Sequence, residues 1–413
     1  MTGKGGWLGA LQLRWLGIER VSAYGYILAF GGALSLIWAY AQATGTGGSD
    51  FLAFWSAGRL VAQGHASQVY DLSAVYHVQA ALSPISREHT AAGEAFAFVN
   101  PPPFLLVVAP LGWLDYRVAL VVWVLATYAL WFWVARRWAP ELAGPIWGFP
   151  GAIVAAWHAQ TGLLLSAVQI AMANLLRDRP AWAGVMVGLL VVKPHLALLV
   201  PVAFVAGRHW RAFWAAGLTV PLFVLLAWLV FGTQTLVNYS HSWPVSQGLM
   251  DYSGPEFFLR QTTVYAALRV ALSARIGMAV QLAVSLAMVI LVWKAWRGSA
   301  ALEGKLALLM AAVPLATPYM FSYDQPFLIL PVCWLARQAR VSPRSGWDRV
   351  MVLAFYTAPL ATRALALPMH MNLMPWVSMA LVWAVWRRLH HPVPEGSARA
   401  AGGAPAEGHV HPF

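Results

Sequence analysis

The sequence contains little charge and almost no cysteine. Charged residues make up only 10% of the 413-residue chain and hydrophobic residues 60%, whereas soluble domains carry about 25% charged residues. The single cysteine, Cys333, lies in an apolar run and has no second cysteine to pair with. These shortages exclude a disulfide-stabilised scaffold, a soluble enzyme and a nucleic-acid-binding domain with a charged soluble face.

Long apolar runs make up much of the sequence. They recur from residue 21 almost to the C-terminus, and they are continuous rather than alternating. In lipid every backbone amide must be paired within the protein, so continuous apolar runs indicate helices rather than a barrel. The sequence therefore predicts an all-α polytopic membrane bundle of about 11 to 13 helical segments, with membrane lipids around it.

The net charge of +12 is concentrated in short connecting segments, a pattern typical of cytoplasmic loops under the positive-inside rule. The main basic positions are Arg136, Arg137, Arg177, Arg179, Arg208, Arg211, Lys294, Arg297, residues 337–349, Arg387 and Arg388. This distribution predicts a membrane protein whose N-terminus lies in the cytoplasm.

The same charges suggest a division of the chain. Residues 1–20 are predicted to be a cytoplasmic segment, residues 21–391 the transmembrane domain, and residues 392–413 a disordered tail. Two extracytoplasmic loops are expected, at residues 44–103 and 232–273. The path between the first loop and Arg136 leaves two alternatives. If the loop lies outside and Arg136 inside, the chain between them must cross the membrane an odd number of times, yet it contains two apolar runs, 104–114 and 118–135. Either the first run is re-entrant or the arginine pair is an exception to the rule.

Some apolar runs are too short to cross a bilayer and meet at polar tips. His158-Ala159-Gln160-Thr161 separates two such runs, and Lys193-Pro194-His195 separates two more. Lipid-exposed helices cannot turn in this way, because their backbone groups would be left unpaired. The pattern predicts broken or hairpin helices that turn inside the protein.

Four ionisable residues are not explained as loop charges: Asp50, His158, Lys193 and Asp324. A carboxylate can accept a proton, an ammonium group can hold a phosphate, and the aromatic residues around Asp324 can stack on sugar faces. Three of the four fall at the predicted outer ends of spans, and the convergence of a carboxylate, an ammonium group and aromatic residues at one membrane face suits a phosphorylated lipid donor and a hydroxyl acceptor. Asp324 is expected to line the same cavity as Lys193, orienting either the acceptor hydroxyls or Lys193 itself.

Several motifs resemble one known family. The first loop contains Gly48-Ser49-Asp50-Phe51, Phe54-Trp55-Ser56-Ala57-Gly58-Arg59 and Val69-Tyr70-Asp71. Further along are Phe98-Val99-Asn100-Pro101-Pro102-Pro103-Phe104, Lys193-Pro194 and Pro318-Tyr319 to Ser322-Tyr323-Asp324. Over roughly residues 45 to 335, this series resembles glycosyltransferase family 87 of the GT-C group. That family includes bacterial polyprenyl-phosphate-mannose-dependent mannosyltransferases.

The resemblance implies a GT-C-like fold and an inverting transfer of a mannose-like hexose at the extracytoplasmic face. The donor is expected to be a polyprenyl-phosphate sugar and the acceptor a lipid-linked or other glycan, with no cofactor and no metal. Asp50 is the expected catalytic base, and Lys193, His195 and Arg59 are the expected ligands of the donor phosphate; Arg260 and Arg269 are the fallback cations. The expected substrate-binding residues are Phe51, Tyr70, Asn100, His158, Gln160, Tyr319, Tyr323 and Asp324.

Other interpretations of these residues remain open. Asp50 precedes an expected helix at residues 51–63 and is also a plausible N-cap, as Asp71 is for the next helix. Lys193 could extend to the membrane surface, and His158 could be a hydrogen-bonded residue of the bundle. A secondary transporter or lipid flippase would use Lys193 and Asp324 as substrate-binding or coupling charges.

Overall fold

The computed structural model describes residues 9, 11–13, 15–43, 50–82, 96–244, 248, 254–341, 343 and 345–390. Over these residues the chain is built of helices joined by short turns, with no named strand and a single isolated β-bridge. The fold class expected from the sequence is confirmed. The tail at 392–413 and half of the segment 1–20 lie outside the described residues.

Five helices are long and apolar enough to cross a membrane. They are α2 (Ile18–Ala43), α7 (Tyr116–Trp138), α13 (Trp210–Phe231), α18 (Ala274–Arg297) and α21 (Asp348–Met369). Helices of 22 to 26 residues rise about 1.5 Å per residue and therefore match a hydrocarbon core about 30 Å thick. The protein is a multi-pass membrane protein.

The other apolar runs are divided into shorter helices. These are α9 (Pro150–His158), α10 (Gly162–Leu175), α11 (Pro180–Leu189), α12 (Val200–Ala206), α19 (Leu302–Ala316), α20 (Ile329–Val341) and α22 (Met374–His390). The interruptions after His158 and before Lys193 fall where the polar tips predicted them. Because of such breaks, the described part of the chain contains 19 α-helices, more than the number of segments expected.

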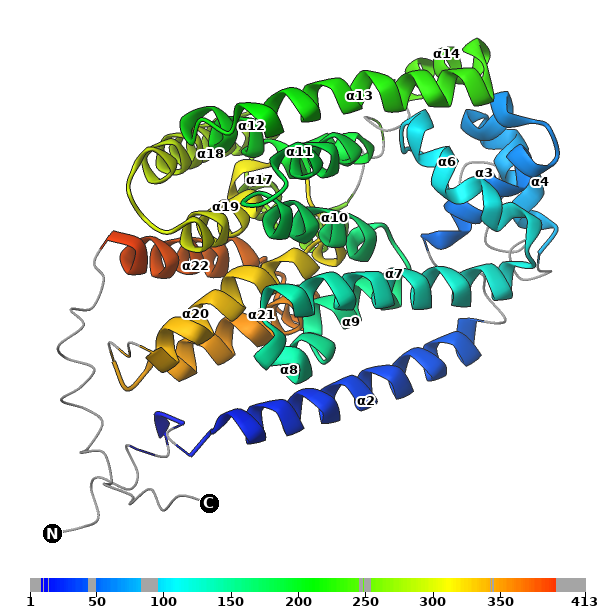
Figure 1. The fold of residues 1–413 in the computed structure, drawn as a ribbon. Helices are drawn as coiled ribbons and strands as arrows, with labels where there is room; N and C mark the ends of the chain where they lie inside the picture. Colours follow the sequence, from blue (N-terminus) through cyan, green and yellow to red (C-terminus); the bar gives the residue numbers. More distant parts are fainter. Residues whose placement is uncertain are drawn as a thin grey trace, which may run out of the picture.

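The bundle has two chemically different ends (Figure 1). The C-terminal ends of α7, α18, α20 and α22, all with basic residues in the last turn, lie toward the left of the view. We call this the basic end. The first-loop helices α3 (Phe51–Ala62) and α4 (Leu72–Ala80) lie at the right together with α14 (Thr233–His241), and we call this the loop end.

The structure decides between the two paths that the sequence left open before Arg136. Residues 102–113 form the short helices η2 (Pro102–Phe104), α6 (Leu105–Val108) and η3 (Ala109–Trp113). They pack at the loop end against α3, so closely that a Cβ on Gly112 would lie 2.1 Å from the Gly58 carbonyl carbon. This segment does not span the membrane, so α7 alone carries the chain to the basic end.

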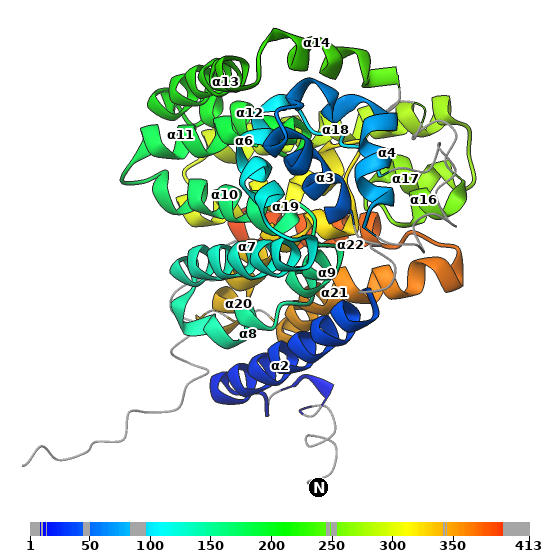
Figure 2. The ribbon, with the colours of Figure 1, turned by 90° about the vertical axis from the view of Figure 1, so that its right-hand side faces the viewer.

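Helix α19 forms the centre of the bundle. Every residue from Leu306 to Ala316 is buried, as expected for a helix that is apolar on all sides. In Figure 2, seen from the loop end, α19 lies near the middle and α2 lies at the periphery. The chain that leaves α19 therefore emerges inside the protein rather than in lipid.

Small residues set the distance between α11 and α13. A Cβ on Gly184 would lie 2.1 Å from the Ala212 carbonyl oxygen, and one on Gly188 would lie 2.4 Å from Cβ of Thr219. Such close approach of helix backbones is common in membrane proteins, where van der Waals packing replaces the hydrophobic effect between helices. It fixes α11, and with it the Lys193 tip, against a full-length span.

We expect Gly184→Ala to lower the thermal unfolding temperature of the detergent-purified protein, because the added methyl group would force α11 away from α13 at a cost of about 1–3 kcal/mol. Gly217→Ala on α13 is the matched control. A Cβ there meets nothing within 4 Å, so this change should be neutral or stabilising. Equal unfolding temperatures for the two variants would contradict the packing account.

Candidate functional site

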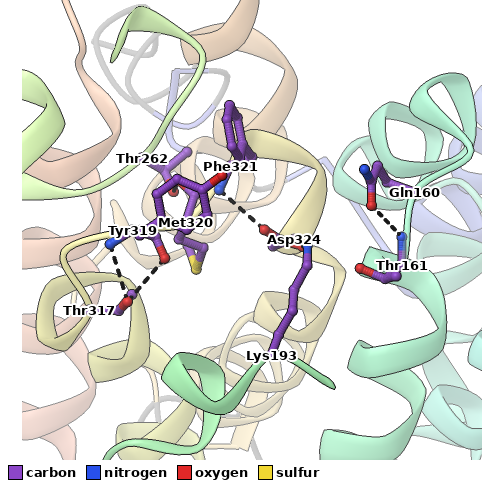
Figure 3. Close-up of polar contacts among 9 residues, drawn as sticks. All are labelled: Gln160, Thr161, Lys193, Thr262, Thr317, Tyr319, Met320, Phe321 and Asp324. Carbon is purple, nitrogen blue, oxygen red and sulfur yellow. Dashed lines mark hydrogen bonds and ion pairs between the residues drawn. The ribbon is translucent and has the colours of Figure 1, made fainter. Parts of the chain in front are cut away.

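Three helix breaks meet inside the bundle (Figure 3). We define the tip cluster as residues 158–161, which join α9 to α10, residues 193–195, which follow α11, and residues 317–325, which follow α19. The rings of His158 and Tyr323 lie 5.3 Å apart, and those of His195 and Tyr319 lie 5.8 Å apart. Segments more than 100 residues apart in the sequence therefore form one polar centre.

A buried ion pair joins two of these tips. Nζ of Lys193 donates to Oδ1 of Asp324 at 2.7 Å, with 12% of the lysine side chain and 1% of the aspartate side chain exposed. The other carboxylate oxygen accepts from the backbone N–H of Phe321 at 3.2 Å. The ammonium group also lies 5.1 Å from the centre of the Tyr323 ring. This is the contact required if Asp324 orients Lys193.

The loop that carries Asp324 is held in place by its neighbours. The backbone N–H of Thr262 donates to the Met320 carbonyl at 2.9 Å, and the N–H of Ser322 donates to the Arg260 carbonyl at 3.1 Å. Between them, Gln261 and Phe321 form an antiparallel bridge. These backbone contacts join residues 260–262 to residues 320–322, so the Asp324 carboxylate is held in a fixed position relative to Lys193.

The first tip packs directly on this loop. A Cβ on Gly162 would lie 1.8 Å from the Tyr323 carbonyl oxygen, so only glycine fits there. Ala159 adopts a left-handed conformation with φ of 45°, and its carbonyl accepts a hydrogen bond of 2.9 Å from the Trp123 indole. This turn brings the His158 ring against Tyr323, the residue before Asp324.

Asp50 lies immediately before α3, but its side chain accepts no capping hydrogen bond. The capping interpretation is therefore not supported for Asp50, whereas Asp71 does cap α4 by accepting from the Ser73 N–H at 2.9 Å. Among the described residues, no hydrogen bond or ion pair engages the Asp50 carboxylate. An unengaged carboxylate is available to accept a proton.

The charge of Asp50 acts on residues of the tip cluster. Burial raises the pKa of Tyr319, and the carboxylates of Asp324 and then Asp50 raise it further. The pKa of Tyr323 is raised by the same causes in the same order. Asp50 also exerts the largest charge effect on His158. The carboxylate at the start of the first loop thus belongs to the same electrostatic centre as the ion pair.

Two arginines complete this centre, and one of them, Arg363, was not among the residues predicted from the sequence. The charges of Arg363 and Arg260 both act on His158, and the charge of Arg260 also acts on Arg363. Nε of Arg363 is buried and has no hydrogen-bond partner in the described part of the chain. Arg363 lies on span α21, and an arginine near the end of an apolar span is the signal that should have identified it.

Several buried polar atoms of the tip cluster have no hydrogen-bond partner among the described residues. Within the described residues these include Oγ1 of Thr161, Nε2 of His195 and both amide atoms of Gln325. Gln160 is engaged, since its Oε1 accepts from the Thr161 N–H at 3.0 Å. Because buried polar groups are nearly always hydrogen-bonded in a working protein, these atoms point to a polar ligand or water.

Other predicted site residues lie elsewhere. Nη1 of Arg59 donates to the Gly112 carbonyl at 3.2 Å, and this arginine lines a separate pocket of about 570 Å³ together with Trp113. It follows Asp50 by nine residues, or about 13 Å along α3. The geometry therefore does not bring Arg59 to the Lys193 ammonium group.

Three predicted substrate-binding residues make packing contacts instead. The Tyr70 hydroxyl donates to the Asn100 carbonyl at 2.8 Å in the layer of first-loop helices. Phe51 has no exposed surface and packs against the rings of Tyr116 and Trp123. The Tyr70 hydroxyl and the Phe51 ring are thus engaged in contacts within the protein.

The family model described as Glycosyltransferase family 87 matches residues 98–318. The chain belongs to this family. Since the match covers more than half of the sequence and includes the His158 and Lys193 tips, it confirms the resemblance, and the protein is a membrane-embedded glycosyltransferase. Family membership decides against the transporter interpretation of Lys193 and Asp324. Neither the curated proteins nor the solved structures gave a match.

We expect Asp324→Asn to destabilise the protein, because removing one member of a buried ion pair leaves an uncompensated charge at a cost of about 3–5 kcal/mol. The measurement is thermal unfolding in detergent. The double variant Lys193→Met with Asp324→Asn should lose less stability than the sum of the two single changes.

The control for this pair is Asp178→Asn, which changes an exposed aspartate in the turn between α10 and α11 and should leave the unfolding temperature unchanged. Strictly additive losses in the double variant would show that the two side chains do not depend on each other, contrary to the ion pair described here.

Proposed function

We propose that the protein transfers a mannose-like hexose from a polyprenyl-phosphate sugar to a lipid-linked or glycan acceptor, with inversion at the sugar carbon. The observation that supports this most is the carboxylate of Asp50, which caps no helix and lies in the same electrostatic centre as Lys193, Arg260 and Arg363. A base and a cluster of cations are the two elements that such a transfer needs.

The reaction is a single displacement. The acceptor hydroxyl gives its proton to the Asp50 carboxylate while its oxygen forms a bond to the anomeric carbon. The bond between that carbon and the phosphate oxygen breaks on the opposite face, and the lipid phosphate leaves with the electron pair. One carboxylate is sufficient because the sugar is never attached to the protein.

The departing phosphate needs positive charge near it. The Lys193 ammonium group has three N–H donors, and the contact with Asp324 uses one of them. Arg260 and Arg363 bring the centre to three cations against the two carboxylates of Asp50 and Asp324. We assign the phosphate to these cations together with His195, and we leave Arg59 out because of its separate pocket.

The sugar and the acceptor would lie against the remaining polar and aromatic groups of the tip cluster. Tyr323 stacks on Phe321 at 5.0 Å with only 14° between the ring planes, and the ring of Tyr319 meets Phe321 edge-on at 5.4 Å. We assign contacts with the hexose to Tyr319, Tyr323 and Gln160, and contacts with the acceptor hydroxyls to His158.

The proposed orientation of the protein in the membrane follows from the charges at the two ends of the bundle. Arginines and lysines gather at the basic end, which the positive-inside rule assigns to the cytoplasm. The loop end, with Asp50 at the start of α3, would then face the extracytoplasmic side of a bacterial cytoplasmic membrane. A polyprenyl-phosphate sugar presented in the outer leaflet would be able to reach the tip cluster.

We expect Asp50→Asn to reduce transfer by a factor of about 10² to 10⁴, the usual contribution of a general base. The amide cannot accept the proton, but it has nearly the same shape, so folding and donor binding should persist. Turnover is measured with purified protein and a polyprenyl-phosphate sugar. The matched control is Asp71→Asn, which keeps the cap of α4; near-normal turnover by Asp50→Asn would rule out the base.

We expect Arg363→Gln and Lys193→Met each to weaken binding of the lipid-phosphate sugar about tenfold or more, since a hydrogen bond to a charged group contributes about 1.5–3 kcal/mol. Lys193→Arg should restore part of the loss, because it keeps the charge. Binding is measured by titration of the reconstituted protein, and each variant's unfolding temperature is recorded alongside.

Arg59→Gln serves as the comparison for these variants, because it removes an arginine that lies outside the tip cluster. If Arg59→Gln weakens donor binding while Arg363→Gln and Lys193→Met leave it unchanged, the phosphate must be bound at the pocket of Arg59 and the assignment is wrong.

A further inference from the structure

A cavity of about 220 Å³ lies at the basic end, away from the tip cluster. It separates α2 from α20 and α21 and is closed on one side by η4 (Pro140–Leu142) and α8 (Ala143–Trp147). We call it the basic-end crevice. The proposed transfer reaction makes no use of it, and it shares no residue with the tip cluster.

The crevice has an apolar interior and a basic mouth. Leu28, Ile329 and Tyr356 line its deep part, whereas Arg340 and Arg349 line it where α20 ends and α21 begins. Ile329 and Arg340 are eleven residues apart, which corresponds to about 16 Å along a helix. This length is close to half of a hydrocarbon core about 30 Å thick, so the crevice matches the depth of one leaflet.

Close backbone contacts fix α2 on the far side of the crevice. A Cβ on Gly25 would lie 2.3 Å from the carbonyl carbon of Gly144, and one on Gly148 would lie 2.2 Å from the carbonyl oxygen of Gly25. The Tyr356 hydroxyl donates to the Pro145 carbonyl at 2.9 Å and links α21 to α8. Since α2 is held against α8 in this way, it cannot also close onto α20.

The mouth carries positive charge. Arg340 is exposed, and no hydrogen bond or ion pair engages it among the described residues; its charge acts on the nearby Glu141 carboxylate, but that carboxylate is ion-paired with Arg337. Arg349 donates from Nη1 to the Leu13 carbonyl at 3.0 Å, which holds its guanidinium group at the crevice. Glu19, the acidic residue in the first turn of α2, is not among the lining residues.

We propose that the basic-end crevice binds one anionic phospholipid from the surrounding leaflet. One acyl chain fills the apolar part between α2 and α20, and the phosphate lies at Arg340 and Arg349. Basic pockets between membrane helices are suited to anionic headgroups, and an apolar space open to a bilayer is favourably filled by hydrocarbon. The bound lipid would attach the peripheral helix α2 to the bundle.

The test uses the full-length protein reconstituted in an equimolar mixture of phosphatidylglycerol and phosphatidylcholine, followed by native mass spectrometry of retained lipid. The wild type should retain one phosphatidylglycerol. Ala336→Phe fills the crevice without changing charge and should reduce the retained fraction about tenfold. Ala287→Phe, at a lipid-facing alanine of α18, is the matched control.

A second pair of variants tests the mouth and does not depend on the folding of Ala336→Phe. Arg340→Gln should reduce retention of phosphatidylglycerol several-fold, whereas Arg297→Gln, at the same end of the bundle but outside the crevice, should leave it unchanged. Equal retention by Arg340→Gln and Arg297→Gln would overturn the proposal, and so would equal retention of the two lipids by the wild type.

Free glycerol phosphate separates a lipid site from a simple anion site. It should not raise the unfolding temperature of the wild type, whereas added phosphatidylglycerol should raise it. An equal rise with both compounds would mean that the acyl chain contributes nothing and that the crevice is not a lipid site.

Discussion

The buried contact between the Lys193 ammonium group and the Asp324 carboxylate is the interaction on which the centre of this structure depends. Neither charge can be left alone at that depth, because transferring an ion out of water costs several kcal/mol unless a partner compensates it. The contact joins the break after α11 to the loop after α19. The third tip is pressed against the same loop through Gly162. Three short helical segments that cannot cross a membrane alone are thereby fixed around one polar point.

This arrangement accounts for the difference between the two carboxylates of the site. Asp324 is fully engaged, by Lys193 on one oxygen and by a backbone N–H on the other, so its charge is committed to the structure. Asp50 belongs to the same electrostatic centre but engages no described side chain. A centre with one committed and one available carboxylate suits a reaction that needs a rigid cation and a free base. In the proposed reaction, the chemistry takes place toward the loop end of the bundle.

Local sequence signals predicted much of the fold because each depends on nearby residues. Apolar run length identified the spans, polar interruptions identified the tips at His158 and Lys193, and the cap at Asp71 followed from residue type. The contacts between distant segments were less accessible. Nothing in the periodicity indicates that Tyr70 meets Asn100, that Phe51 packs inward, or that Arg59 occupies its own pocket. Arg363 was missed because its apolar span looked complete without it, and its role emerges only when α21 packs beside α9.

The most direct measurement of the central claim uses the purified wild-type protein in liposomes with a panel of polyprenyl-phosphate sugars and a glycan or lipid-linked acceptor. Free polyprenyl phosphate and the anomeric configuration of the product are followed together. The account predicts that lipid phosphate is released only when donor and acceptor are both present, in equal amount to the product and with inverted configuration. Transfer from a nucleotide sugar in the absence of any lipid-linked donor, or a product with retained configuration, would contradict it.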